Sequence, residues 1–268
     1  MNADITTISP NSNVVQQTFK INKKRPLVVI GCAPCQGFSA HRKKDSDKPE
    51  DKRNTLIGYF SDIAVNLNPD FVVMENVPEI LTGKYKKHYE EAKNVFIQNG
   101  YYVVQRVYNA AGFGVPQARI RAIIVASKYK NFVLPDEMLS VEEYKTVRDA
   151  IADLPHVDAR HQTQLVDRYH RCSTHKQSTI DVIAQVPHDG GSRPKGVGPK
   201  CLDKVNGFSD VYGRLRWDKP SITITQYARN PASDRYSHPE QNRGFTIREV
   251  ARLQSFPEGY PWTGSSGD

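Results

Sequence analysis

The feature of this sequence that most constrains its fold is a pair of short apolar runs with a helical pattern between them. The runs at residues 27–31 (LVVIG) and 71–76 (FVVMEN) are rich in β-branched residues, as buried parallel strands are. Between them, apolar residues recur with the spacing of one helix face, and Asn68-Pro69-Asp70 ends that pattern. The order predicts a βαβ unit, whose two strands run parallel.

The next residues continue the alternation of helix and strand. A helix is expected at about 85–98, ended by Asn99-Gly100, and strands are expected at 101–110 and 121–127. The segment between these strands, AGFGVPQARI, is polar and glycine-rich, so we expect it to lie outside the core. The fold class is therefore α/β, with a mostly parallel sheet and helices on its faces.

Periodicity fades after about residue 134. Residues 135–210 are polar and mixed and include the loop-like HDGGSRPKGVGPK, which predicts a smaller, irregular second domain. Order returns at 220–225 (PSITIT), a predicted strand, and at 246–256 (TIREVARLQSF), a predicted helix. Thr246 would be the N-cap of this helix, and Glu249 would complete a capping box.

Composition narrows the choice of partner and compartment. The 268 residues carry a formal charge of +8, which favours a polyanionic partner such as nucleic acid, although a solvated basic surface gives the same charge. The sequence has no apolar run of the length that spans a membrane and no signal-peptide pattern, so no membrane partner is expected. Its 4 cysteines are irregularly spaced, and in the cytosol they would stay thiols.

The pair Cys32 and Cys35 has the C-x-x-C spacing and leaves four interpretations open. A structural zinc site needs two further ligands, and Cys172 and Cys201 form no second tight pair. A redox dithiol or two buried apolar side chains would also fit. The fourth interpretation is a nucleophile, because Pro34 before Cys35 and Gln36-Gly37 after it suggest a tight turn at the carboxyl end of a strand.

Polar side chains at neighbouring strand ends supply partners for such a nucleophile. Glu75 ends the second apolar strand, and Gln117, Arg119 and Arg121 precede or begin a later one. These groups are expected to gather with Cys35 on one rim of the sheet.

The motifs GCAPCQGFS, ENV and QARIR, together with RWDKPSITIT and RGFTIREVARLQSFPEGY, resemble those of the DNA cytosine-5 methyltransferases. The resemblance covers nearly the whole chain apart from its middle. Ala33 stands where this family often has a second proline. The RNA cytosine methyltransferases also use a Pro-Cys turn, but they carry a cysteine where Glu75 stands here, so the DNA family fits better.

The resemblance implies a Rossmann-like fold that uses S-adenosyl-L-methionine, with a smaller target-recognition domain. Residues 1–134 would form a partial catalytic domain, 135–210 the target-recognition domain, and 211–268 a return segment that completes the catalytic domain. The substrate would be cytosine in double-stranded DNA, and the setting would be the cytoplasm of a prokaryote or phage host, at the nucleoid.

The resemblance also implies catalytic roles. The thiolate of Cys35, in a turn shared with Gln36, would add to C6 of cytosine and activate C5 for methylation. Glu75 would hydrogen-bond the N3 and N4 edge of the base and help to protonate N3. Arg121 would hold O2 of the base and orient Glu75, and Arg119 would support the loop or contact phosphate.

C6 lies inside the duplex stack, so the target base must be flipped out of the helix. The loop after Cys35 resembles the mobile lid of the family. Target recognition is expected at about 145–210, with GGSRPKG (190–196) as a contact loop. The predicted DNA contacts are Ser39, Arg42, Lys43, Gln117, Arg193 and Lys195.

For the cofactor, Asp4 would meet the adenine amino group, Ile5 the adenine ring, and Pro34 the neighbouring part of the site. The glycine-rich turn that the family places before these motifs is not found, nor is its last motif, and about 60 residues would be missing at the front. A truncated gene, a split enzyme with a second chain, and a catalytically dead DNA-binding relative all fit this pattern. Truncation is favoured, because both ends of the chain interrupt a motif, and we expect weak or no cofactor binding and little methylation by the 268 residues alone. A regulatory DNA-binding subunit or a tRNA methyltransferase is the alternative function.

Overall fold

The structure is a computed structural model that describes residues 3–10, 13–22, 24–34, 52–160, 167–204 and 210–263, with the main chain alone at 52, 53 and 84. These residues form two compact units. The first consists of Met1–Tyr108 and Ile120–Asp136, and the second of Asn109–Arg119 and Glu137–Asp268. This division puts residues 211–268 in one unit with 137–204. The predicted assignment of residues 1–134, 135–210 and 211–268 to catalytic and target-recognition domains stays a prediction.

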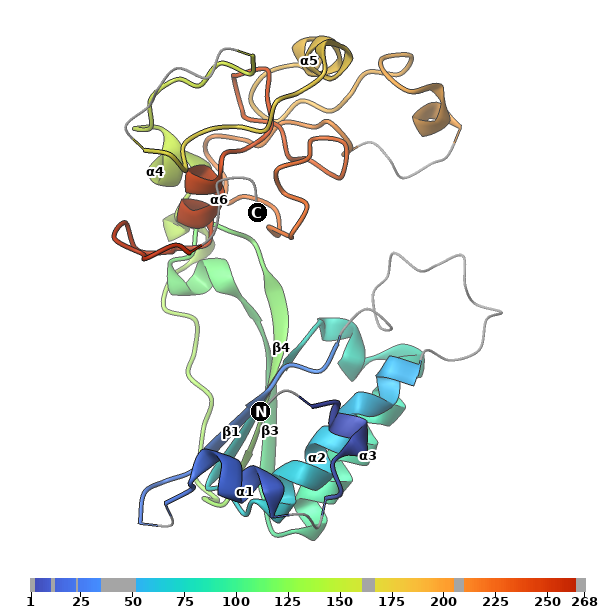
Figure 1. Cartoon of the computed structure of the whole chain (residues 1–268), viewed down its shortest axis with the longest axis vertical. Helices are drawn as coiled ribbons and strands as arrows, with labels where there is room; N and C mark the ends of the chain where they lie inside the picture. Colours follow the sequence, from blue (N-terminus) through green and yellow to red (C-terminus); the bar gives the residue numbers. More distant parts are fainter. Residues whose placement is uncertain are drawn as a thin grey trace. The chain divides into compact units, whose positions relative to one another are not determined.

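The first unit contains a four-stranded sheet in the order β1-β2-β4-β3 (Figure 1). Its strands are β1 (Val28–Gly31), β2 (Phe71–Asn76), β3 (Tyr102–Asn109) and β4 (Ile120–Ser127). Strands β1 and β2 pair in parallel, with Gly31 opposite Met74. Because α2 (Leu56–Asn66) connects these two strands, the predicted βαβ unit is confirmed.

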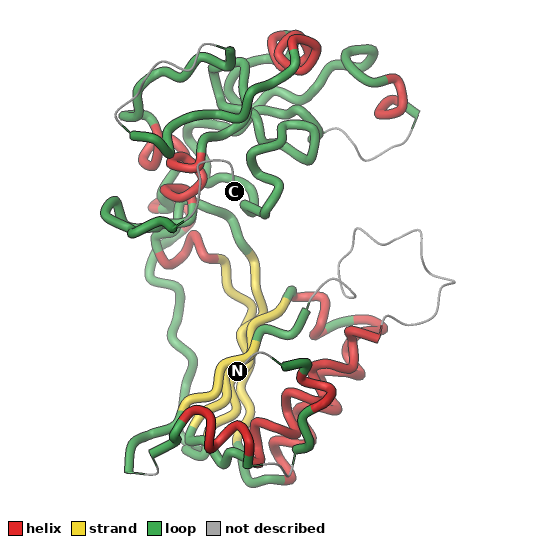
Figure 2. Tube along the Cα trace, viewed as in Figure 1, coloured by secondary structure: helices red, strands yellow, loops and turns green. Residues whose placement is uncertain are grey.

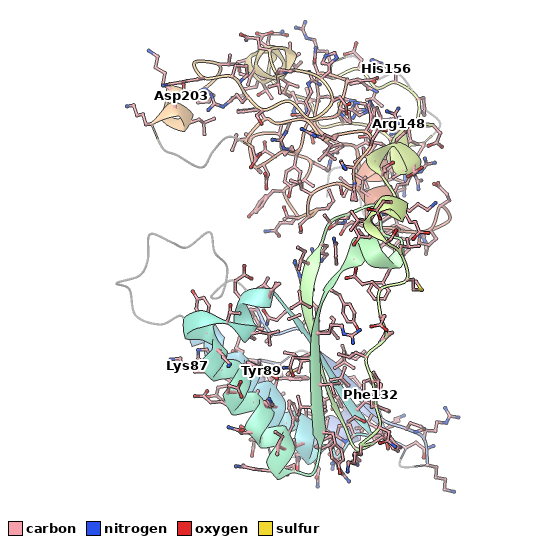
Figure 3. The ribbon with its side chains drawn as sticks, turned by 180° about the vertical axis from the view of Figure 1, so that it is seen from behind. Lys87, Tyr89, Phe132, Arg148, His156 and Asp203 are labelled. Atoms are coloured by element: carbon pink, nitrogen blue, oxygen red, sulfur yellow. The ribbon has the colours of Figure 1, made fainter. Side chains whose placement is uncertain are left out.

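Two helices, α2 and α3 (Lys86–Gln98), lie side by side and cover one face of this sheet (Figure 1). Alternate residues of β2 and β4, such as Val72 and Ile124, point into the apolar core beneath the helices. Tyr89 of α3 belongs to this core, whereas Phe132 lies on the other side of the sheet and contacts the ring of Phe71 (Figure 3). The helix α1 (Val14–Phe19) lies before β1.

The fourth strand corrects the expectation of a mostly parallel sheet, because β4 pairs with β2 in the antiparallel direction. Only a loop with a short 3-10 helix at Ala110–Phe113 joins β3 to β4. A strand that is parallel to its predecessor needs a long crossover, usually a helix, and no helix of that length is present here. As a result, the carboxyl end of β2 meets the amino end of β4.

The second unit is built mainly from loops around short helices (Figure 2). Its helices are α4 (Val147–Ile151), α5 (Gln177–Ala184) and α6 (Ile247–Leu253). One apolar cluster joins α4 and α6 through residues that include Trp217 and Phe245, and a second cluster surrounds Ile183. The predicted strand at 220–225 is wrong: only Ser221 makes a β-bridge, to Gln117. Pro220 lacks the N–H that a ladder would use at its start.

The loop between β3 and β4 is also more buried than expected. Ala111 is fully buried, and Gln117 is only 2% exposed. A polar side chain can occupy such a place when its hydrogen bonds are satisfied, and the Gln117 amide accepts from Ile224 N–H and donates to Leu253 C=O. The polar composition of this loop therefore does not exclude it from the interior.

Several local signals end elements where the sequence predicted. Asn68 follows α2 with a φ of 50°, and Gly100 follows α3 with a φ of 82°, so both take the left-handed conformation that stops a helix. Thr246 and Glu249 form the predicted capping box of α6.

In the part of the chain that the structure describes, no helix is long and apolar enough to cross a bilayer.

Candidate active site

An ion pair joins the ends of β2 and β4. The Nε atom of Arg121 lies 2.8 Å from Oε1 of Glu75, and their side chains are 20% and 32% exposed. The antiparallel register brings the two together, since Asn76 at the end of β2 lies opposite Ala122, the neighbour of Arg121. A second donor of the guanidinium, Nη1, bonds the carbonyl of Ile120 at 2.8 Å. Arg121 therefore holds the Glu75 carboxylate in one place at the rim of the sheet.

The next residue of β2, Asn76, connects this rim to the segment after β1. Its Nδ2 donates to the carbonyl oxygen of Ala33 at 3.2 Å, and its Oδ1 accepts from the N–H of Val77 at 2.9 Å. Asn76 is 2% exposed. The chain that leads to Cys35 is thus bonded directly to the strand end that carries Glu75. Cys35 and Gln36 lie outside the described residues.

Close packing fixes the end of β1. A Cβ atom added to Gly31 would lie 2.2 Å from the Phe60 ring of α2, so any larger residue would force the ring to move. Beyond Gly31, Cys32 and Pro34 are exposed and Ala33 packs against the core. Among the described residues, no group of three or more His, Cys, Asp or Glu side chains is placed to hold a metal ion.

The other two residues from the loop before β4 lie in the second unit. Arg119 is half-buried, and its carbonyl accepts from Ala110 N–H at 2.9 Å. Its predicted role in supporting the loop stays a prediction. Gln117 has both ends of its amide bonded inside the protein, which argues against its predicted contact with DNA.

The predicted cofactor residues at the N-terminus lie on a 3-10 helix, Ile5–Thr7, that packs against α2. The Oδ1 atom of Asp4 accepts from the N–H of Thr6 at 2.9 Å and from its hydroxyl at 2.8 Å. The backbone bond, and then the hydroxyl bond, lower the pKa of Asp4. A carboxylate has about four acceptor positions, so Asp4 keeps capacity for a further donor such as an amino group.

The predicted DNA contacts of the second unit differ in their surroundings. The side chain of Arg193 is 5% exposed and pairs with Asp203 at 2.9 Å (Asp203 is labelled in Figure 3). It also donates to the carbonyl of Val197, so its guanidinium is bonded within its own loop. These bonds and the burial of the side chain argue against a contact with phosphate. Lys195 on the same loop is exposed. Ser39, Arg42 and Lys43 lie outside the described residues.

The second unit contains a buried charge network that the sequence analysis missed. Arg243 pairs with Glu249 through two bonds of 2.8 and 2.7 Å, and both residues are 1% exposed. Burial opposes the ionisation of Glu249, but the charge and hydrogen bonds of Arg243 outweigh it and lower the pKa of Glu249. One signal in the sequence could have indicated this pair. The side chain of a capping-box glutamate bonds the N-cap backbone, and when it is buried its charge needs a basic partner, which Arg243 supplies from just before the helix.

Two further basic groups lie in the same interior. Arg214 is fully buried and donates to the carbonyls of Val186, Ile183, His238 and Gln241. Burial lowers the pKa of Arg214 to about 10. Burial also lowers the pKa of His238 to about 3, and its Nδ1 accepts from two backbone N–H groups. The buried surroundings of His238 therefore favour its neutral form.

The sheet and the helices on its face give the first unit an α/β fold. A crystal structure assigned to a DNA modification methyltransferase encoded within an E. coli prophage matches 95% of this chain and 75% of that one, with a TM-score of 0.65 and 23% identity. At this identity the likeness establishes the fold alone, and it confirms the predicted fold class.

The family follows from the sequence comparison. The family model for C-5 cytosine-specific DNA methylases matches residues 2–267, so the chain belongs to that family. It is 35% identical over 261 residues to the type II methyltransferase M1.HphI of Haemophilus parahaemolyticus, covering 97% of this chain and 66% of that protein. It is 32% identical over 242 residues to the type II methylase M.HgiDII of Herpetosiphon aurantiacus, covering 87% and 66%. The chain thus spans about two thirds of the length of these relatives.

Proposed function

We propose that this chain carries the base-handling site of a DNA cytosine-5 methyltransferase. The observation that supports this most strongly is the ion pair of Glu75 and Arg121, with 2.8 Å between Oε1 and Nε, at the rim of the sheet. Asn76 bonds the segment before Cys35 to the same rim. A nucleophile, an acid group and a cation are the three groups that activation of a cytosine ring requires. Membership of the family supports cytosine in DNA as the substrate class.

The proposed reaction begins when the Cys35 sulfur bonds to C6 of a flipped cytosine and the C5–C6 double bond opens. Glu75, once it has taken up a proton from solvent, binds the N3 and N4 edge and passes that proton to N3, which offsets the negative charge that the thiolate brings. Arg121 uses its remaining donors on O2 of the base. The C5 carbon takes an electrophile, and its hydrogen leaves as a proton to water. N3 returns its proton to Glu75, and the sulfur–C6 bond breaks to restore the ring and release the thiolate.

S-adenosyl-L-methionine would supply the electrophilic methyl group when bound. Asp4 and Ile5 fit its adenine, because an ionised acceptor stands beside an aliphatic side chain on one short helix. Pro34 stays a predicted contact. Calorimetric titration of the 268 residues with the cofactor tests the expected weak binding, and tight binding would contradict it. A second chain as the source of the glycine-rich turn stays a prediction, as does a location at the prokaryotic nucleoid.

Two assays with duplex DNA test the proposed function. The first follows exchange of the cytosine C5 hydrogen with deuterium from solvent, which needs addition at C6 but no methyl donor. The second follows transfer of a labelled methyl group. We expect exchange by the unaltered chain, loss of exchange in Cys35→Ser, and a loss of about 100-fold or more in Glu75→Gln.

Cys201→Ser is the matched control, because Cys201 is an exposed cysteine of the second unit. It should exchange at the rate of the unaltered chain. Equal rates in Cys35→Ser and Cys201→Ser would overturn the proposal. A tRNA substrate in the same assays decides between the DNA reaction and the RNA alternative.

A further inference from the structure

The ENV motif contains a second polar residue, Asn76, that the proposed chemistry does not use. It is 2% exposed, and both ends of its amide are bonded. The donor end reaches Ala33, which lies 43 residues earlier in the chain. A buried amide that links two strand ends is costly to leave unpaired, so its bonds hold the two segments together.

The place of this bond in the sheet gives it a specific task. The parallel register of β1 and β2 ends at Gly31 and Met74. Ala33 has left the ladder, and Pro34 has no N–H with which to continue it. The Asn76 side chain therefore extends the connection between the two strands beyond the last ladder pair, two residues before Cys35 in the sequence.

The chemistry of the two bonds explains why asparagine occupies the position. Residue 76 must donate to the Ala33 carbonyl and accept from the Val77 N–H at the same time. An ionised aspartate has the length but lacks the donor, and alanine lacks both. Glutamine has both groups but is longer by one methylene, which a buried site of fixed geometry does not accommodate.

We propose that Asn76 is the positioning residue of this site: its amide fixes the backbone of Ala33, two residues before Cys35 in the sequence, to the strand end that carries Glu75. Asn76 touches neither the base nor the reacting atoms, and acts through the backbone of Ala33. This inference rests on the proposed function, because the alignment of thiol and carboxylate matters only if both meet one ring. A displacement of about 1 Å at a reacting centre can cost about 100-fold in rate.

The first test compares C5 hydrogen exchange by the unaltered chain, Asn76→Asp and Asn76→Ala. At a pH at which the new carboxyl group is ionised, Asn76→Asp removes the donor and keeps the acceptor for Val77, whereas Asn76→Ala removes both without adding charge. We expect kcat to fall by about 100-fold in both variants while KM for DNA changes by less than about threefold. Unchanged kcat in either folded variant would overturn the inference, and so would a change confined to KM.

Asn99→Asp is the control. Asn99 also donates its amide to a carbonyl, that of Val95 at 2.8 Å, but it is exposed at the end of α3. Its variant loses the same kind of bond away from the rim and should keep kcat. Thermal unfolding of all variants identifies any that fail to fold, and an equal loss of kcat in Asn99→Asp would show that the effect is general.

If the unaltered chain does not exchange C5 hydrogen, that result would count against the proposed function. A second measurement then still tests the role of Asn76. Backbone hydrogen–deuterium exchange is followed in the peptides that cover Val28–Pro34 and Lys86–Gln98. In Asn76→Asp we expect at least about threefold faster exchange in the first peptide and no change in the second. Equal protection of Val28–Pro34 with and without the Asn76 donor would contradict a positioning role whether or not the chain is active.

Discussion

Gly31 ends β1 against the Phe60 ring, and this contact allows a stability test with a built-in control. Gly31→Ala should lower the free energy of unfolding by about 1–3 kcal/mol, because the new Cβ would lie 2.2 Å from the ring. Gly58 in α2 has nothing within 4 Å of an added Cβ. Gly58→Ala should therefore raise stability by about 0.5–1 kcal/mol, and urea unfolding of both variants checks the opposite signs.

His238 makes stability depend on pH between 7 and 5. Burial lowers its pKa to about 3, against an ordinary value of 6.5, while the charges of Glu249 and Arg243 act in opposite directions. In this range the unfolded chain binds a proton that the folded chain does not, so stability falls as the pH falls below 6.5. Between pH 6.5 and 5 the loss should be about 2 kcal/mol.

Chemical unfolding at pH 7 and pH 5 measures this dependence. The variant His238→Gln should be less stable at pH 7 but should lose less stability on acidification. His188 is exposed and does not contribute to the shift of His238, so His188→Gln should keep the full dependence. A difference between pH 7 and 5 that His238→Gln leaves unchanged would contradict the assignment.

The helix α6 starts with a capping box in a buried setting, whereas α4 starts with the same motif at the surface. Thr246 accepts from Glu249 N–H and also contacts Nδ1 of His170 at 3.0 Å. Thr146 accepts from Asp149 N–H in an exposed position. Thr246→Ala should cost about 2 kcal/mol and Thr146→Ala about 0.5–1 kcal/mol in thermal unfolding. Equal losses would show that burial of the cap adds nothing.

These elements also indicate how far the sequence alone predicts this fold. Strands β1 and β2, the helices α2 and α3, and the cap of α6 follow from local patterns, and the structure confirms each of them. The antiparallel pairing of β4 was not predicted, because strand pairing depends on residues far apart in the chain. For the same reason the pairing of Arg243 with Glu249 and the burial of Gln117 were missed.

At the candidate site, the strand-end argument placed Glu75 and Arg121 on one rim, and the structure pairs them there. Their chemical roles stay predictions. Asn76 was overlooked although it stands beside Glu75, because asparagine at a strand end is a common turn residue. Its partner is the backbone carbonyl of Ala33, and no pattern of residue types identifies a backbone group as a partner.

The net charge of +8 predicts a strong salt dependence if the chain binds DNA. The logarithm of the binding constant should fall linearly with the logarithm of salt concentration, by about 0.9 for each phosphate neutralised. Lys195→Ala should reduce this slope by about 1, because Lys195 is exposed. Arg193→Ala should mainly lower thermal stability, since Arg193 bonds Asp203 and Val197 inside its loop. Fluorescence anisotropy between about 50 and 200 mM salt measures the slopes.

The proposed function depends on addition of the Cys35 thiolate to C6 of a cytosine that faces Glu75. Exchange of the cytosine C5 hydrogen in duplex DNA, followed by mass spectrometry in deuterated water without a methyl donor, tests it most directly. The account predicts deuterium at C5 with the unaltered chain and none with Cys35→Ser. Deuterium incorporation that persists in Cys35→Ser, or none with the unaltered chain bound to DNA, would contradict it.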